Sequence, residues 1–299
     1  MGTQFWWFYD VMAAASLLLC IYLNGRKGIF KAAVMVVSCI VGVLLAVPMS
    51  GAVSENIYKT VIRDNNIKKL NKSLIDVEIS SYLADALDNM GYNVIVNTQK
   101  IDEILESDKD VDEQIYKYLN NINGKVVDKE AIFQNNLNQA YAGVMKKLIS
   151  ADLTNYAVAT ASQKITDGKT DFGNLLKIIK TGEQRDEAAK IIADTYTADA
   201  YKNVIRLLVC VIMFAVVFAF GLLTAKALTG SQREIDESTG SHIAGGVCGI
   251  FTGAAIVFII AVAVRLYVVM GSNEMLFFNN EAIDKTFIFK YAYNIASKL

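Results

Sequence analysis

The sequence predicts an all-α membrane protein with four membrane-spanning helices and a helical extracytoplasmic domain inserted between spans two and three. The chain has 299 residues, of which 54% are hydrophobic, and it contains a single proline. Its apolar residues gather in four stretches of about 18 or more residues with few or no charges, the length a helix needs to cross a bilayer. These stretches are 5–23, 29–47, 207–225 and 243–264.

The N-terminal part, 1–49, is predicted to form a transmembrane hairpin with spans at about 5–23 and 29–47. No Lys or Arg precedes the first apolar run, which is long, so we interpret it as a retained span rather than a cleavable signal. Trp6 and Trp7 at its start are typical of an interfacial aromatic belt. Pro48 is expected to stop the second helix.

Residues 50–202 form the hydrophilic insert, which holds 19 of the 29 Lys/Arg and 23 of the 30 Asp/Glu residues. An insert of this length can bury a core of its own. Helical spacing of apolar residues predicts one helix capped by Ser73, one over 111–121 and a longer one from about Asp128 to Leu153. Only 93–97 (NVIVN) suggests a strand.

A second transmembrane hairpin is predicted over 203–272, with spans at about 204–225 and 243–270. The helical pattern from about residue 183 continues into the third span without a breaker, so we expect one continuous helix there. Residues 273–299 form a tail in which apolar residues recur at spacings of three to five. That pattern suits an amphipathic helix, either on the bilayer surface or packed on the insert.

Gly245, Gly249 and Gly253 recur every four residues in the fourth span and therefore lie on one side of its helix. Small residues at this spacing let another backbone approach closely, which is a main source of helix association in lipid. We interpret them as a helix-packing face. Its partner is either the third span of the same chain or a neighbouring copy, which would make a homo-oligomer.

Orientation follows from the short loop after the first span, where Arg26, Lys27, Gly28 and Lys31 stand without an acidic residue. Positive charge in short loops favours the cytoplasm. The N-terminus, the insert and the C-terminus are then expected outside, although the lysines of the tail indicate the opposite orientation.

The motif Arg26-Lys27-Gly28-Ile29-Phe30-Lys31 between two spans, an Asp early in span one (Asp10) and glycines every four residues opening span four resemble the colicin V production protein (CvpA) family. The resemblance covers about 1–49 and 203–270. It implies a protein of the bacterial plasma membrane linked to toxin production or envelope maintenance. Two features depart from the family: Ser241-His242 stands where the family often has Asp-Arg, and the insert is far longer than the usual connection.

Ionisable groups inside spans are candidate functional residues, and Asp10, Arg206 and Arg265 are expected to share the outer leaflet. Three interpretations are open: snorkelling or capping, a structural ion pair, and a proton or ion path. The third would make the protein a small transporter or channel, which is the alternative function.

The sequence contains few other residues that indicate catalysis, metal binding or nucleic-acid binding. The four cysteines all lie within spans, and the only histidine, His242, is interpreted as a solvated turn residue. The acidic run 102–113 lacks the pattern of a calcium loop and is interpreted as a solvated helix surface. Basic and acidic residues are interleaved, which disfavours nucleic-acid binding.

We therefore expect a non-enzymatic membrane scaffold or accessory protein with no cofactor and no bound metal. Its partners would be the lipid bilayer and, through residues 50–202, another protein or a cell-wall component.

Overall fold

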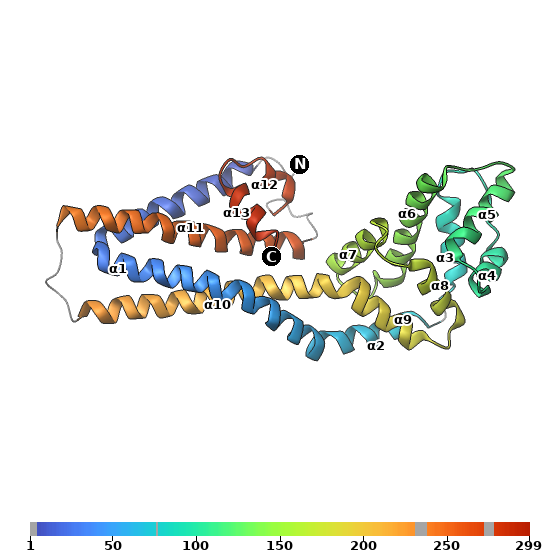
Figure 1. Ribbon diagram of the computed structural model, residues 1–299, viewed down its shortest axis with the longest axis horizontal. Helices are drawn as coiled ribbons and strands as arrows, with labels where there is room; N and C mark the ends of the chain where they lie inside the picture. Colours follow the sequence, from blue (N-terminus) through green and yellow to red (C-terminus); the bar gives the residue numbers. More distant parts are fainter. Residues whose placement is uncertain (1–4, 76, 231–237, 272–277) are drawn as a thin grey trace. The chain divides into compact units, whose positions relative to one another are not determined.

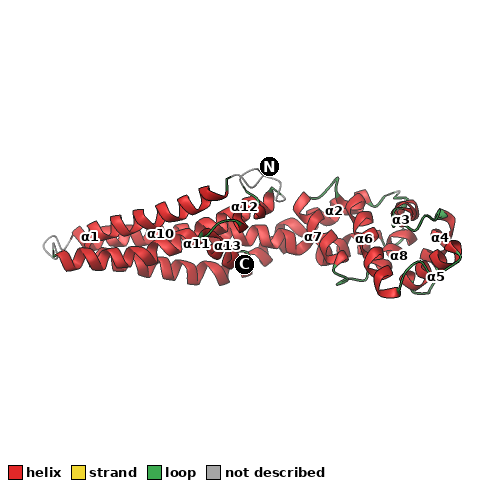
Figure 2. Ribbon diagram, turned by 90° about the horizontal axis from the view of Figure 1, so that it is seen from above, coloured by secondary structure: helices red, strands yellow, loops and turns green. Residues whose placement is uncertain are grey.

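A computed structural model describes residues 5–75, 77–230, 238–271 and 278–299, and the described residues form helices and no strand (Figure 1; Figure 2). The predicted all-helical class is confirmed. The predicted strand at 93–97 is wrong, because side chains satisfy its backbone: Val96 N–H donates to Asp88 Oδ1 at 2.7 Å and Asn97 N–H donates to the Tyr118 hydroxyl at 2.9 Å. The chain divides into two compact units, Met1–Ile57 with Lys202–Leu299 (unit 1) and Tyr58–Tyr201 (unit 2).

Unit 1 is built on three long helices, and two short helices follow them: α1 (Trp6–Ile57), α10 (Ala198–Gly230), α11 (Thr239–Met270), α12 (Asn280–Asp284) and α13 (Phe289–Ala296). The three helical runs that contain α1, α10 and α11 are long and apolar enough to cross a membrane. Large apolar side chains point outward along them, and Leu18, Leu44 and Phe220 are each about two-thirds exposed. An apolar exterior of this extent is typical of a lipid-facing surface.

Helix α1 breaks at Gly28, whose φ of 74° and ψ of 168° are not helical. A straight helix would hold residues 10 and 51 about 60 Å apart. Instead both lie near the last residues of the chain: Asp10 accepts hydrogen bonds from 287–289, and Gly51 adjoins Arg206, which donates to the Leu299 carbonyl. The helix therefore folds back on itself at Gly28, as Figure 1 shows, into a first arm (6–27) and a second arm (29–57).

The second arm of α1 runs antiparallel to α10. Glu55 forms an ion pair with Lys202 at 2.6 Å, and Gly42 lies against Phe214. At the other end of the pair, Gly221 lies against Ser38, so residue numbers fall along one helix as they rise along the other. Gly42 leaves room for the Phe214 ring, and Gly221 lets its helix approach Ser38.

Unit 2 consists of ten consecutive helical segments, two of them π-helical: η1 (Tyr58–Ile62), α2 (Arg63–Ser73), α3 (Ile79–Asp88), α4 (Thr98–Glu106), α5 (Val111–Asn123), α6 (Glu130–Ile149), α7 (Asn155–Thr166), α8 (Phe172–Thr181), α9 (Arg185–Ile191) and η2 (Ile192–Thr197). One hydrophobic core joins them, and the apolar faces of α3 and α6 contribute fully buried leucines such as Leu83, Leu87 and Leu137. Each such side chain contributes about 1.5–3 kcal/mol when it leaves water.

Local signals explain where several of these helices begin and end. The side chains of Asn97, Asp110 and Asp171 each accept a hydrogen bond from a backbone N–H in the first turn of the helix that follows. Gly124 and Gly182 follow α5 and α8 in the left-handed conformation, which glycine adopts without strain. The helix expected over 111–121 is therefore confirmed as α5, with two further residues.

Of three expectations about helix ends, the structure contradicts two and confirms one. Pro48 does not stop its helix, which continues to Ile57, and membrane helices tolerate proline more readily than soluble ones. Ser73 ends α2 and caps no helix, because its hydroxyl donates to Asp152. The continuous helix into the third apolar stretch is confirmed, since Arg185–Ala227 is helical throughout.

Candidate functional site

The glycine face of α11 packs against the first arm of α1. A Cβ built on Gly249 would lie 2.5 Å from Ile21 Cα and 2.6 Å from the Cys20 carbonyl oxygen. One built on Gly245 would lie 2.6 Å from the Asn24 carbonyl oxygen, and one on Gly253 would lie 3.1 Å from Leu17 Cα. The partner in this chain is thus the first apolar stretch. The sequence had offered only the third stretch or a second copy, because it gives no sign of which helices are neighbours.

Asp10 caps the N-terminus of α13. Its Oδ2 accepts from the N–H of Phe287 at 2.7 Å, and its Oδ1 accepts from Ile288 at 2.9 Å and Phe289 at 3.0 Å. A helix N-terminus presents unpaired N–H groups and a partial positive charge, so a carboxylate there is favourable. The geometry at Asp10 therefore matches the capping interpretation.

The two arginines of unit 1 also contact the C-terminal segment. Arg265 Nη1 donates to the Tyr293 hydroxyl at 3.3 Å, and Arg206 Nη1 donates to the main-chain oxygen of Leu299. Among the described contacts, neither arginine pairs with Asp10. All three charges therefore hold residues 287–299 in place, and the described geometry gives them no common path through the helices.

The C-terminal segment is amphipathic, with one face against α1 and α11. Phe289 and Tyr293 are buried, and the Phe289 ring stacks on Tyr9 with centroids 5.1 Å apart. Phe287 and Tyr291 are instead about two-thirds exposed. Two short helices, α12 and α13, stand where the sequence predicted one amphipathic helix, and they pack on α1 and α11, a partner that the sequence had not offered. Residues 273–277 of the predicted tail lie outside the described residues.

The basic loop is closed against the first turn of α11. Buried Gly28 has the positive φ of the break, and the next N–H, of Ile29, donates to Ser241 Oγ at 3.1 Å. His242 Nδ1 lies 2.8 Å from the Gly25 carbonyl oxygen. His242 is exposed, as expected, but it lies in the first turn of α11 rather than in a loop turn, because α11 begins at Thr239, where Ser238 caps the helix. Of the basic side chains, Arg26 and Lys27 are exposed and Lys31 is half-buried.

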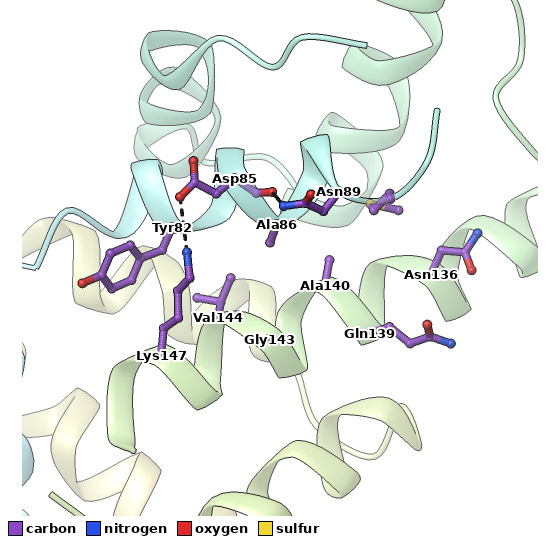
Figure 3. Close-up of a pocket in the computed structure, with 11 residues that line it drawn as sticks. Tyr82, Asp85, Ala86, Asn89, Asn136, Gln139, Ala140, Gly143, Val144 and Lys147 are labelled. Atoms are coloured by element: carbon purple, nitrogen blue, oxygen red, sulfur yellow. Dashed lines mark hydrogen bonds and ion pairs between the residues drawn. The ribbon is translucent and has the colours of Figure 1, made fainter. Parts of the chain in front are cut away.

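Unit 2 carries a cleft of about 380 Å³ between α3 and α6 (Figure 3). Polar side chains line it from both sides: Tyr82 and Asp85 from α3, Asn89 directly after α3, and Asn136, Gln139 and Lys147 from α6. Lys147 forms an ion pair with Asp85 at 3.2 Å, and its ammonium lies 5.1 Å from the centre of the Tyr82 ring. Gly143 forms part of the floor, and no described atom lies within 4 Å of a Cβ placed there.

The polar groups of this cleft are suited to recognition of a ligand. Amides supply both donors and acceptors of hydrogen bonds, and the aromatic ring of Tyr82 supplies an apolar surface. Asn136 Nδ2 already donates to the Tyr92 hydroxyl at 3.0 Å, which holds its amide in one orientation. Gln139 is exposed, and the described contacts contain no hydrogen bond from its side chain.

The acidic run 102–113 is less solvated than expected, because several of its carboxylates have structural partners. Asp102 accepts from both Lys180 and Ser80, and the bond from Lys180 is the main reason that its pKa lies below the ordinary value. Asp112 accepts from the buried Tyr141 hydroxyl at 2.7 Å, and burial raises the pKa of Tyr141 well above its usual range. Among the described residues, no three His, Cys, Asp or Glu side chains gather where they could hold a metal ion.

Searches against protein-family models, curated proteins and solved structures find no match to this chain. The resemblance to the CvpA family therefore depends on the short motifs of the apolar helices, and the role that it implies stays a prediction.

The cleft residues were absent from the candidates drawn from the sequence. A signal was present: Asp85 of α3 and Asn89, the residue that caps this helix, are four residues apart, while Asn136 and Gln139 are three apart on α6, so each pair shares a helix face. Such polar pairs occur on every solvated helix. Only the packing of α3 beside α6 brings the two faces together.

Proposed function

We propose that the protein is a non-enzymatic membrane scaffold or accessory protein whose helical insert binds a partner outside the cytoplasm. The observation that carries the proposal is the division of the chain. A unit with its own buried core and a polar cleft is inserted into a chain whose remaining long helices are apolar on their outer surface. This is the organisation of a binding domain held at a membrane.

Four membrane crossings follow if each arm of α1 crosses separately. The reversal at Gly28 supports this count, because each arm is long enough to span a bilayer and each has an antiparallel partner. The basic residues at 26–31 lie at the turn between the arms and favour the cytoplasm for that end. The N-terminus, the insert and the C-terminal segment would then all face outward.

The partner is a protein or a cell-wall component that the cleft between α3 and α6 recognises through its amides and Tyr82. The resemblance to the CvpA family supports a role in toxin production or secretion, or in envelope maintenance, at a bacterial plasma membrane. No observation favours the alternative of a transporter or channel, since Asp10, Arg206 and Arg265 each bond the C-terminal segment.

Site-specific photo-crosslinking tests the proposal in the full chain in its native membrane. A photoreactive residue replaces Gln139, which lines the cleft and is exposed. We expect a discrete adduct that disappears when Gly143→Trp fills the cleft. The matched control is Asn135→Trp, on an exposed position of α6 that does not line the cleft. Absence of an adduct, or equal loss in both tryptophan variants, would contradict binding at this cleft.

A further inference from the structure

A groove of about 660 Å³ lies on unit 1 between the first arm of α1 and the start of α11. Its walls are apolar along most of their length, with Ile21 on one side and Ile243, Val247 and Ile250 on the other. Its polar side chains are Tyr22, Arg26, Thr239 and His242, and Arg26 carries the positive charge. A single groove thus combines an apolar channel with a cationic end.

Two glycines line the groove. Gly25 and Gly246 both line it, and a Cβ on Gly246 would meet only Ile21 Cγ2 at 3.8 Å and its carbonyl oxygen at 4.0 Å, which are ordinary contacts. Gly249, one turn further on, is by contrast closed against the backbone of α1. Gly246 is therefore not needed for helix contact. Its lack of a side chain leaves space on the outer surface of the pair.

The Arg26 guanidinium has no acidic partner among the described contacts. Arg26 Nη1 donates to the Tyr22 hydroxyl at 3.2 Å, which uses one of the five donors of a guanidinium and leaves the rest available. Within the basic loop, Arg26, Lys27 and Lys31 stand without an acidic residue.

We propose that this groove binds an anionic glycerophospholipid, with the phosphate at Arg26 and one acyl chain along Ile21, Val247 and Ile250. A planar guanidinium holds phosphate oxygens in a bidentate manner, and basic residues at the cytoplasmic ends of membrane helices attract anionic lipids. The His242 ring, fixed by the Gly25 carbonyl, forms the side of the headgroup site. The inference depends on the membrane embedding of unit 1 under the proposed function, and it is independent of partner binding at α3 and α6.

Lipid competition on the full chain tests the assignment. Purified protein in detergent receives dioleoylphosphatidylglycerol, dioleoylphosphatidylcholine or soluble glycerol 3-phosphate, and bound lipid is counted by native mass spectrometry. We expect phosphatidylglycerol to bind about tenfold more tightly than phosphatidylcholine, because both lipids carry the phosphate but the choline ammonium brings a second positive charge beside Arg26. Glycerol 3-phosphate should not displace it, because it lacks the acyl chain.

Paired variants separate the groove from general surface charge. Arg26→Gln should remove the preference for phosphatidylglycerol, whereas Lys27→Gln, which changes the net charge equally outside the groove, should keep it. Gly246→Leu should block both lipids, whereas Gly240→Leu, on a residue with no described atom within 4 Å of its Cβ, should not. Equal binding of the two lipids, or equal effects within either pair, would overturn the proposal. Failure of the chain to enter liposomes would instead contradict the membrane assignment.

Discussion

Replacing one glycine of the α11 face should separate α11 from the first arm of α1. In Gly249→Ala the new Cβ would stand 2.5 Å from Ile21 Cα and 2.6 Å from the Cys20 carbonyl oxygen. Carbon atoms attract best at about 3.5–4.0 Å, so the two helices must move apart by about 1 Å. Both obstructing atoms belong to the backbone, which means that no side-chain rotation can relieve the contact.

The magnitude follows from two opposing terms. Forcing extra volume into a packed contact costs about 1–3 kcal/mol, while replacing glycine by alanine within a helix returns about 0.8–1 kcal/mol. We expect Gly249→Ala to lower the free energy of unfolding by up to about 2 kcal/mol. Gly240→Ala is the matched control on the same helix, since open space surrounds its Cβ, and it should be neutral or stabilising by up to about 1 kcal/mol.

The assay is equilibrium unfolding of the full chain in mixed micelles with increasing dodecyl sulfate. Trp6 and Trp7 are the only tryptophans, and both lie at the start of the first arm, so their fluorescence reports on the contact. The two alanine variants should differ by about 2 kcal/mol, more than a tenfold change in the equilibrium constant. Equal stability of Gly249→Ala and Gly240→Ala would refute the close approach of these two helices.

Three further predictions concern the C-terminal segment, unit 2 and the orientation. In Asp10→Asn, one carbonyl oxygen remains where two carboxylate oxygens accept from the backbone N–H groups of 287–289. Hydrogen exchange of those amides should therefore accelerate about tenfold. Unchanged exchange would show that Asp10 does not cap this helix. The pKa of Asp102 is lowered in the folded state, so its contribution to stability is present above about pH 4 and lost as pH falls through the lowered value. Lys180→Met should therefore cost about 0.5–1 kcal/mol in denaturant unfolding at pH 7 and nothing at pH 2, whereas an equal cost at both pH values would contradict the charge pairing. A membrane-impermeant maleimide should label Lys125→Cys on intact cells, and protection until lysis would reverse the predicted orientation.

The sequence predicted the helical class, the apolar stretches and α5, because these depend on local spacing and on capping residues. Gly124 after α5 is one example: its positive φ is a property that glycine supplies wherever it stands. Pro48 shows the limit of such signals. Its local preference is to end a helix, yet the helix continues to Ile57, beside side-chain hydroxyls that bond to nearby carbonyls.

Pairing between distant segments was not predictable in the same way. The packing face of Gly245, Gly249 and Gly253 was recognised from its four-residue period, but a period carries no information about which helix fills the face. The polar cleft of unit 2 was missed for the same reason. Its two faces lie on α3 and α6, and polar positions at helical spacing are common on any solvated helix.

The three ionisable groups of the apolar helices all bond the C-terminal segment. Taken singly, Asp10, Arg206 and Arg265 each suggested a functional site, since a charge at membrane depth is costly. In the structure each one bonds backbone or side-chain groups of 287–299. The C-terminal segment brings N–H groups to the carboxylate, and oxygens to the arginines. A short amphipathic helix can therefore close one end of the helical bundle, because it binds charged side chains that would otherwise have to reach water. Deletion of the segment should destabilise unit 1 by more than the loss of its small buried apolar area predicts.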